Sequence, residues 1–212
     1  MKITKDQLKC WKACQDGYGW FLRRFPDGEA EYQDVLNALA EDDRPADAAW
    51  LMNHAGPDRE SVLEVEVIAD CKHFFASGRL VIKTSATVAG QLTAGDGIEA
   101  GTCINAGEGI KAGTYIEAGT CINAGNGIKA GWGIKAGLGI KAGMGIEAGE
   151  GIKAGNGLKA GEGIKAGEGI EAGGGFGVFA GLRLQLADWP INARVIANVK
   201  PDNLVSGSWA NQ

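Results

Sequence analysis

The sequence predicts a mainly β protein whose centre is a single-stranded parallel β-helix. A hexapeptide with the consensus Ala-Gly-x-Gly-Ile-(Lys/Glu/Asn) repeats without a break from residue 94 to residue 171, and a degenerate copy follows at 172–177. A unit of six residues cannot bury an apolar face alone, so such units are stable only when they stack into a solenoid. Glycine makes up 35 of the 212 residues and is periodic in this run, which excludes a disordered glycine-rich linker.

An internal duplication predicts the length of each coil. The segment 102–107, with the sequence TCINAG, recurs unchanged at 120–125, an offset of 18 residues or three hexads. Three hexads match a triangular coil with one hexad on each side, so the stretch 86–177 would make about five coils. Cys103 would then stack on Cys121 at about 4.8 Å, the usual spacing between strands. We expect two parallel free thiols there, with a disulfide as the alternative.

Residues 1–60 are predicted to form a small helical module. Thr4 and Gln7 have the Thr-x-x-Gln spacing of a capping box, which marks the start of a helix. Later parts of the module include a helix over 29–40 and a last helix with Pro45 in its first turn. We expect the core of this module to contain Trp11, Trp20, Phe21, Tyr32 and Trp50.

Residues 61–181 are assigned to the β-helix and the strands that lead into it. The segments 62–68 and 80–82 are rich in valine, leucine and isoleucine, as strands are. Residues 182–212 are assigned to a C-terminal β cap, because the terminal coils of solenoids need a polar or bulky cover. The strands predicted after the repeat are 178–186, 192–199 and 203–209.

Within each hexad, the alanine and the isoleucine are predicted to point inward and the charged sixth residue outward. The glycine in the second position suits a tight corner with unusual backbone dihedrals. Over roughly residues 80–177 this pattern resembles that of the hexapeptide-repeat proteins, and the resemblance implies a left-handed parallel β-helix. The chain departs from that family's pattern because alanine takes the first inward position and isoleucine the second.

The chain also resembles bacterial and phage-encoded proteins of unknown function that are rich in Gly-Ile-Lys-Ala-Gly repeats. The segment Phe75–Gly78 leads into the repeat and Val178–Leu182 leads out of it, as in those proteins. The motif spanning Ala13–Phe21 is similar to their small helical module. This resemblance implies the architecture and a bacterial or phage origin, and it implies no activity.

The residues that could carry chemistry favour a protein that is not an enzyme. Enzymes on left-handed β-helices, such as acyltransferases, use histidines that project from the coils, and this repeat contains none. No cysteine spacing indicates a zinc site. We therefore expect no cofactor, no metal and no catalytic residue. The open alternative is an enzyme whose site lies where the helical module meets the β-helix, around His54, Cys71 and His73.

The formal net charge of -5 comes mostly from residues 1–60, which carry 8 Lys and Arg against 12 Asp and Glu. The repeat mixes Lys and Glu, which argues against a nucleic-acid partner. The chain has no run of about 18 apolar residues and no signal-peptide stretch at its start. We therefore expect no membrane association and a reducing, cytoplasmic location.

Three consecutive hexads carry apolar residues at the variable third position, namely Trp132, Leu138 and Met144. With an 18-residue coil they form a collar around one turn, and Tyr115 should neighbour Trp132. Exposed apolar clusters tend to be contact sites, so these four residues are predicted to bind a protein partner or a second copy in a homodimer. The alternative is that the helical module or the C-terminal tail packs over them.

The function predicted from these observations is a structural or protein-interaction scaffold. In a phage or prophage, such a scaffold would act as an inhibitor of a host protein.

Overall fold

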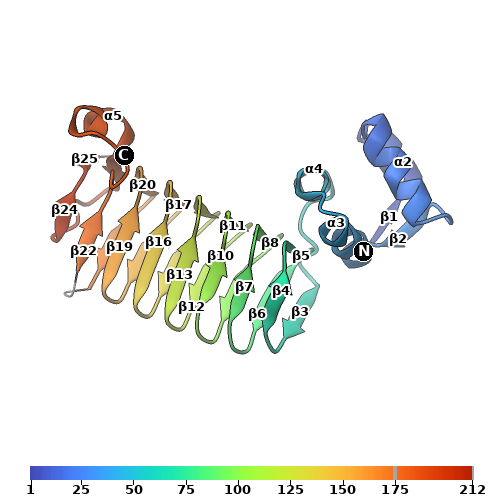
Figure 1. Cartoon of the computed structure of the whole chain (residues 1–212), viewed down its shortest axis with the longest axis horizontal. Coiled ribbons are helices and arrows are strands. Elements are labelled where there is room, and N and C mark those ends of the chain that lie inside the picture. Colours follow the sequence, from blue (N-terminus) through green and yellow to red (C-terminus); the bar gives the residue numbers. More distant parts are fainter. Residues whose placement is uncertain (174–175, 212) are drawn as a thin grey trace.

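The computed structural model describes residues 1–173 and 176–211, and it shows a helical module followed by a long parallel β-solenoid (Figure 1). The described strands of the solenoid form parallel sheets of seven, eight and eight strands. The shaft therefore contains about eight coils, and the prediction of five was too low. The difference arises because the strands before and after the repeat join the same three sheets as the repeat itself.

Each full coil contributes one strand to each of three sheets, here called sheets 1, 2 and 3. Sheet 1 comprises β3 Val62–Val65, β6 Arg79–Ile82, β9 Ile98–Ala100, β12 Ile116–Ala118, β15 Ile134–Ala136, β18 Ile152–Ala154 and β21 Ile170–Ala172. Sheet 2 comprises β4 Ile68–Cys71, β7 Ala86–Val88, β10 Ile104–Ala106, β13 Cys121–Ala124, β16 Gly139–Ala142, β19 Gly157–Ala160, β22 Gly177–Phe179 and β24 Leu204–Ser206. Sheet 3 comprises β5 Phe74–Ala76, β8 Leu92–Ala94, β11 Ile110–Ala112, β14 Ile128–Ala130, β17 Ile146–Ala148, β20 Ile164–Ala166, β23 Arg194–Ile196 and β25 Ser208–Ala210.

The core of the shaft consists of stacked columns of identical residues. In the strands of the repeat, the isoleucine and the alanine two residues later face inward, and the residue between them faces outward. Ile110, Ile128 and Ile146 pair directly across neighbouring strands, so each isoleucine lies on another one. The Cα atoms of Cys103 and Cys121 lie 4.6 Å apart, which confirms the 18-residue coil.

The glycine in the second position of each hexad is needed because neighbouring coils approach each other closely there. A Cβ atom on Gly131 would lie well inside van der Waals contact with the carbonyl oxygen of Gly113, one coil earlier. None of these corner glycines in the described repeat has a positive φ, so the expectation of unusual dihedrals was wrong. The fourth position is looser, since a Cβ atom on Gly133 would meet the carbonyl oxygen of Gly151 at 3.5 Å, an ordinary contact. This looseness explains why the fourth position also accepts cysteine and tyrosine.

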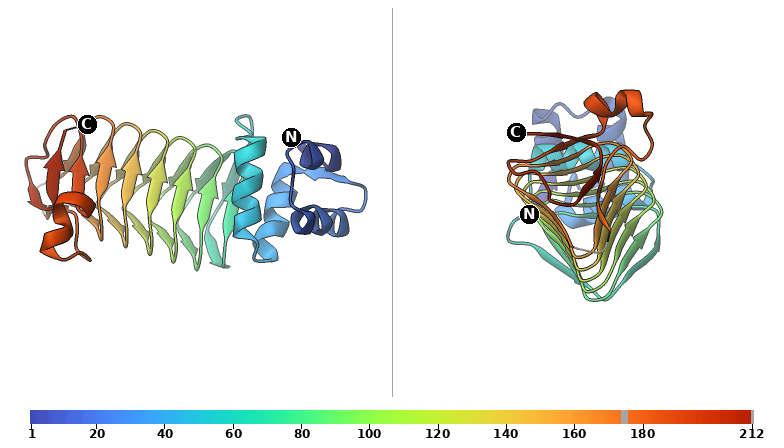
Figure 2. Two further views of the ribbon diagram at one scale, coloured as in Figure 1. Left: turned by 90° about the horizontal axis from the view of Figure 1, so that it is seen from above. Right: turned by 90° about the vertical axis from the view of Figure 1, so that its left-hand side faces the viewer.

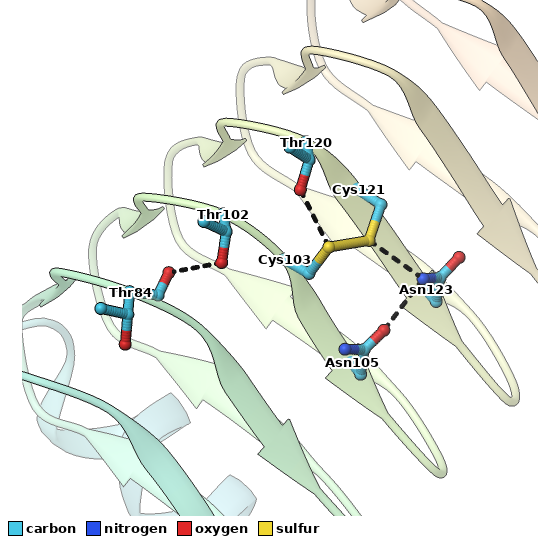
Figure 3. The surroundings of a disulfide bond; sticks show 7 residues. All are labelled: Thr84, Thr102, Cys103, Asn105, Thr120, Cys121 and Asn123. Carbon is cyan, nitrogen blue, oxygen red and sulfur yellow. Dashed lines mark hydrogen bonds between the residues drawn. A yellow bond between two sulfur atoms is a disulfide. The ribbon is translucent and has the colours of Figure 1, made fainter.

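Cys103 and Cys121 form a disulfide between adjacent coils, so the expectation of two free thiols was wrong (Figure 3). Strand pairing alone brings their Cα atoms within the range that a disulfide spans. Beside the disulfide, the side-chain amide of Asn123 donates a hydrogen bond of 2.9 Å to Asn105 of the previous coil. Since disulfides persist mainly in oxidising compartments, the cysteines no longer support a reducing location.

The helical module contains four helices and a short two-stranded antiparallel sheet. They are β1 Lys2–Thr4, α1 Lys5–Cys10, α2 Gln15–Arg24, β2 Glu29–Glu31, α3 Tyr32–Glu41 and α4 Pro45–Ala55. The capping box between Thr4 and Gln7 is present. The helix predicted from residue 29 begins at Tyr32, because residues 29–31 pair with β1. Of the aromatic residues predicted for the core, Trp20, Phe21 and Tyr32 are buried, whereas Trp11 and Trp50 are partly buried.

The module covers the N-terminal edge of sheet 3. Helix α3 packs on β5, and the side chain of Gln33 bonds to the backbone there. Its amide nitrogen donates to the carbonyl oxygen of Phe75 at 2.7 Å, and its oxygen accepts from the N–H of Ser77 at 2.9 Å. These bonds satisfy backbone groups that an open sheet edge would expose.

The segment after β22 leaves the shaft instead of continuing it as a strand. Gly181 has a φ of 78°, and the chain then forms the 3-10 turn η1 Leu186–Asp188 and the short helix α5 Trp189–Asn192. The strand predicted over 178–186 is therefore confined to β22, and its alternating leucines lie in a turn. The chain returns to the shaft in β23, β24 and β25, which supply strands near both segments predicted at the C-terminus.

Candidate functional site

A groove of about 700 Å³ runs along the outer face of sheet 3. Ala49 and Met52 of α4 line one end, and Ile191 and Asn192 of α5 line the other. Both helices project from the same side of the shaft, so they stand at the two ends of this face (Figures 1 and 2). From β5 to β23 the sheet has seven strands, which makes the groove about 29 Å long at the usual strand spacing.

The groove is hollow because glycine occupies the fourth hexad position at every repeat corner that lines it. These residues are Gly109, Gly127, Gly145 and Gly163. The other two corners of the shaft also carry glycine at this position in most coils, but larger residues interrupt it there, namely Cys103, Tyr115 and Cys121. Without side chains at this corner, the outward side chains of sheet 3 form the floor of the groove.

The floor of the groove carries an excess of positive charge. Lys111, Lys129, Glu147 and Lys165 line it, and Arg194 adds a cation near α5. Lys129 pairs with Glu147 across neighbouring strands at 2.8 Å, and this hydrogen bond holds the pKa of Glu147 below its ordinary value. Within residues 1–173 and 176–211, Lys111, Lys165 and Arg194 form no direct ion pair, although Lys165 lies beside Glu147 on the neighbouring strand and also lowers its pKa.

Two of the four residues predicted to bind a partner border this sheet. Met144 lines the groove and is 43% exposed, and Trp132 is 55% exposed at the opposite corner of sheet 3. Trp132 follows β14 and Met144 precedes β17, and these two strands pair with each other. The two apolar side chains therefore flank the middle of sheet 3.

The other two predicted residues lie elsewhere, so the four do not form one continuous surface. Leu138 is exposed at the corner between sheets 1 and 2. Tyr115 shares a corner with Trp132, but its ring packs against Gly97 and its hydroxyl donates to Glu99, one coil nearer the N-terminus. Burial, together with this hydrogen bond, raises the pKa of Tyr115 to about 12. The proposed cover over Trp132, Leu138 and Met144 by other parts of the chain is not seen, because all three stay exposed.

The junction between module and shaft holds His73 in a fully bonded, buried position. Its Nδ1 accepts the N–H of Gln91 at 3.1 Å, so Nε2 carries the hydrogen and donates to Asp43 at 2.9 Å. Lys72 also bonds to Asp43, and together with His73 it holds the pKa of that carboxyl below its ordinary value. His73 therefore joins the turn between α3 and α4 to the shaft.

The structure places His54, Cys71 and His73 in different surroundings. His54 lies on α4, with its Nδ1 2.8 Å from the carbonyl oxygen of Trp50, and its ring contacts aromatic rings of the module. Cys71 is partly buried in β4, and this burial raises the pKa of its thiol. In the described part of the chain, no three His, Cys, Asp or Glu residues are grouped as metal ligands. No described helix has the length and apolar character needed to cross a membrane.

Sequence reasoning missed the lysines of the groove and the α5 wall. Sorting the sixth hexad position by coil face places Lys111, Lys129 and Lys165 in one row, and the constant glycine at the adjoining corner is the signal that could have marked this row as a groove. The α5 wall could not have been found from the sequence, because its position depends on where the chain leaves the shaft.

Comparison with known proteins gives one match, which covers the helical module. The YdhT N-terminal domain family matches residues 1–55, and the matched region ends where α4 ends. The match includes about a quarter of the chain and none of the solenoid. No curated protein and no solved structure matches the chain.

Proposed function

We propose that the protein is a non-enzymatic scaffold that binds an acidic, amphipathic helix of a partner protein in the groove on sheet 3. The observation that carries this proposal is the set of unpaired cations on the groove floor, bordered by apolar side chains. Carboxylates on the partner would bind Lys111, Lys165 and Arg194, and its apolar residues would contact Met52, Met144 and Ile191.

The geometry favours a helix over an extended peptide. The groove presents the face of sheet 3, whose backbone groups already pair with neighbouring strands, so it cannot accept an added strand. A helix satisfies its own backbone hydrogen bonds. At 1.5 Å per residue, about 19 residues would fill the groove from α4 to α5.

The same features favour a protein over a nucleic acid. Nucleic-acid sites neutralise a continuous row of phosphates, whereas Glu147 interrupts this row of cations and remains charged. The apolar residues at both ends and along one side suit the apolar face of an amphipathic helix.

Site-specific photo-crosslinking in the native host tests the proposal. A photoreactive amino acid in place of Thr93, which lines the groove, should crosslink a partner protein, whereas the same residue in place of Thr87 on sheet 2 should not. The crosslinked segment, identified by mass spectrometry, should be acidic and helical. Equal crosslinking from both positions would contradict a site on sheet 3.

Charge reversal separates the groove from general electrostatic attraction. Lys111→Glu with Lys165→Glu should abolish the crosslink from Thr93. The matched control is Lys141→Glu with Lys159→Glu, which places the same charges on sheet 2. If both pairs of substitutions weaken the crosslink equally, the net charge of the protein and not the groove controls binding.

A further inference from the structure

At the C-terminal end of the shaft, the last strands of sheets 2 and 3 are open edges, whereas the segment 198–203 bonds to the last strand of sheet 1, because the side chain of Asn203 donates to the carbonyl oxygen of Ala172 at 2.6 Å. Within residues 1–173 and 176–211, the last strands β21, β24 and β25 each have a neighbouring strand on one side only. In β25, the N–H of Ser208 bonds to Ala193 and the carbonyl of Ala210 accepts from Ala197, both toward the shaft. The backbone groups of Trp209 between them therefore point to the open side.

The apolar columns of the core also end there without a cover. Trp209 pairs with Val195 and Leu204 pairs with Val178, so both continue inward-facing columns. Val195 and Val178 are fully buried, whereas Trp209 is 38% exposed and Leu204 is partly buried. Figure 2 shows α5 beside the shaft and not over its end. The last coil thus exposes apolar core surface, whereas in every earlier coil the following coil covers this surface.

The last strands of sheets 2 and 3 lack the features that keep sheet edges apart. Proteins block pairing between edges with lysines, prolines or covering segments. β24 has the sequence LVS and β25 has the sequence SWA, and neither contains a charge or a proline. Val205 in β24 is 60% exposed.

The shape of the C-terminal end limits which surface can pair with it. Two sheet edges that meet at one corner of a three-sided core, here β24 and β25, can both be paired only by another solenoid end with the same cross-section. The N-terminal end of a second copy cannot pair in both sheets, because α3 and the side chain of Gln33 already occupy the edge of its sheet 3. The remaining match is the C-terminal end of a second copy.

We propose that two copies of the chain join through their C-terminal coils, edge to edge, around a twofold axis perpendicular to the shaft. The two chains circulate in opposite senses at the contact, so strands pair antiparallel across it. The contact uses the same surface on both copies and closes, which gives a dimer and not a filament. This inference does not depend on the groove, which lies on the side of the shaft.

Mass measurement over a range of concentrations tests the dimer. Light scattering on the eluting protein should show a mass near twice 22.0 kDa at about 100 µM, with dissociation on dilution. Val205→Lys combined with Ser208→Lys puts charges on two edge strands and should shift the dissociation constant upward at least about 100-fold. The matched control, Val62→Lys, places a lysine on the terminal strand at the opposite end and should leave the dimer intact.

If a variant loses its last coil, hydrogen exchange of the backbone amides in the unmodified protein still tests the dimer. In the unmodified protein, β24 and β25 should exchange more slowly at high than at low concentration, and β3 should not change. A monomer at every concentration would overturn the proposal. A dimer that survives the edge substitutions while circular dichroism shows a folded shaft would overturn it as well.

Discussion

Replacing both Cys103 and Cys121 by serine removes the covalent link between two neighbouring coils but leaves the hydrogen-bonded pairing of β10 and β13. The disulfide closes a loop with a sequence separation of 18 residues. A loop of that length restricts the unfolded chain by about 3 kcal/mol at 25 °C. We therefore expect the free energy of unfolding to fall by about 3 kcal/mol and the melting temperature by about 6–12 °C.

Denaturant unfolding followed by circular dichroism measures this effect, and thiol counting checks its cause. The unfolded, unreduced protein should show the three thiols of Cys10, Cys14 and Cys71, and reduction should add two more. A reducing agent should lower the stability of the unmodified protein by the same amount and leave the double serine variant unchanged. Five thiols before reduction, or an unfolding midpoint that ignores the reducing agent, would refute the reasoning.

Three further predictions concern the coil corner, the junction and a tyrosine. Gly131→Ala should destabilise the shaft by about 1–3 kcal/mol because its Cβ meets backbone, whereas Gly133→Ala should be close to neutral in the same unfolding assay, and equal effects would contradict the stacking explanation. The pKa of Asp43 is lowered, so its stabilising effect is complete above the ordinary aspartate pKa and is lost as pH falls through the lowered value. Asp43→Asn should therefore reduce the melting temperature at pH 7, and the two proteins should converge in acid. Because the pKa of Tyr115 is raised to about 12, its stabilising effect is complete below the ordinary tyrosine pKa and is lost as pH rises through about 12. Ultraviolet titration of Tyr115→Phe should lack the ionisation near pH 12, and its persistence would contradict the assignment.

The sequence was sufficient to predict the coil but not the number of coils. The TCINAG duplication gives the 18-residue period because stacked coils place like residues on like residues. The first and last coils lack the glycine pattern, yet Leu63, Leu80 and Val195 occupy the same inward columns. Their role follows from pairing with residues far away in the sequence, which a local pattern does not contain.

The groove was less accessible to sequence reasoning than the shaft. Met144 and Trp132 were identified because apolar residues interrupt a polar position. The end walls depend on two tertiary features. The bond between His73 and Asp43 fixes the turn before α4, and Gly181 directs the chain out of sheet 2 toward α5. Neither consequence can be inferred from residue type alone.

Because the coils are uniform, the distance between the two ends of the shaft is set by the number of coils. Since each coil stacks on its neighbours through the same glycine corner, a genetic duplication or loss of 18 residues would change the distance between α4 and α5 by about 4.8 Å and keep both on one side. A change of six residues would instead turn α5 by a third of a revolution, away from α4. Recombination within the repeat can therefore change the distance between α4 and α5 in steps of one coil. Most other insertions would place these two helices on different sides of the shaft.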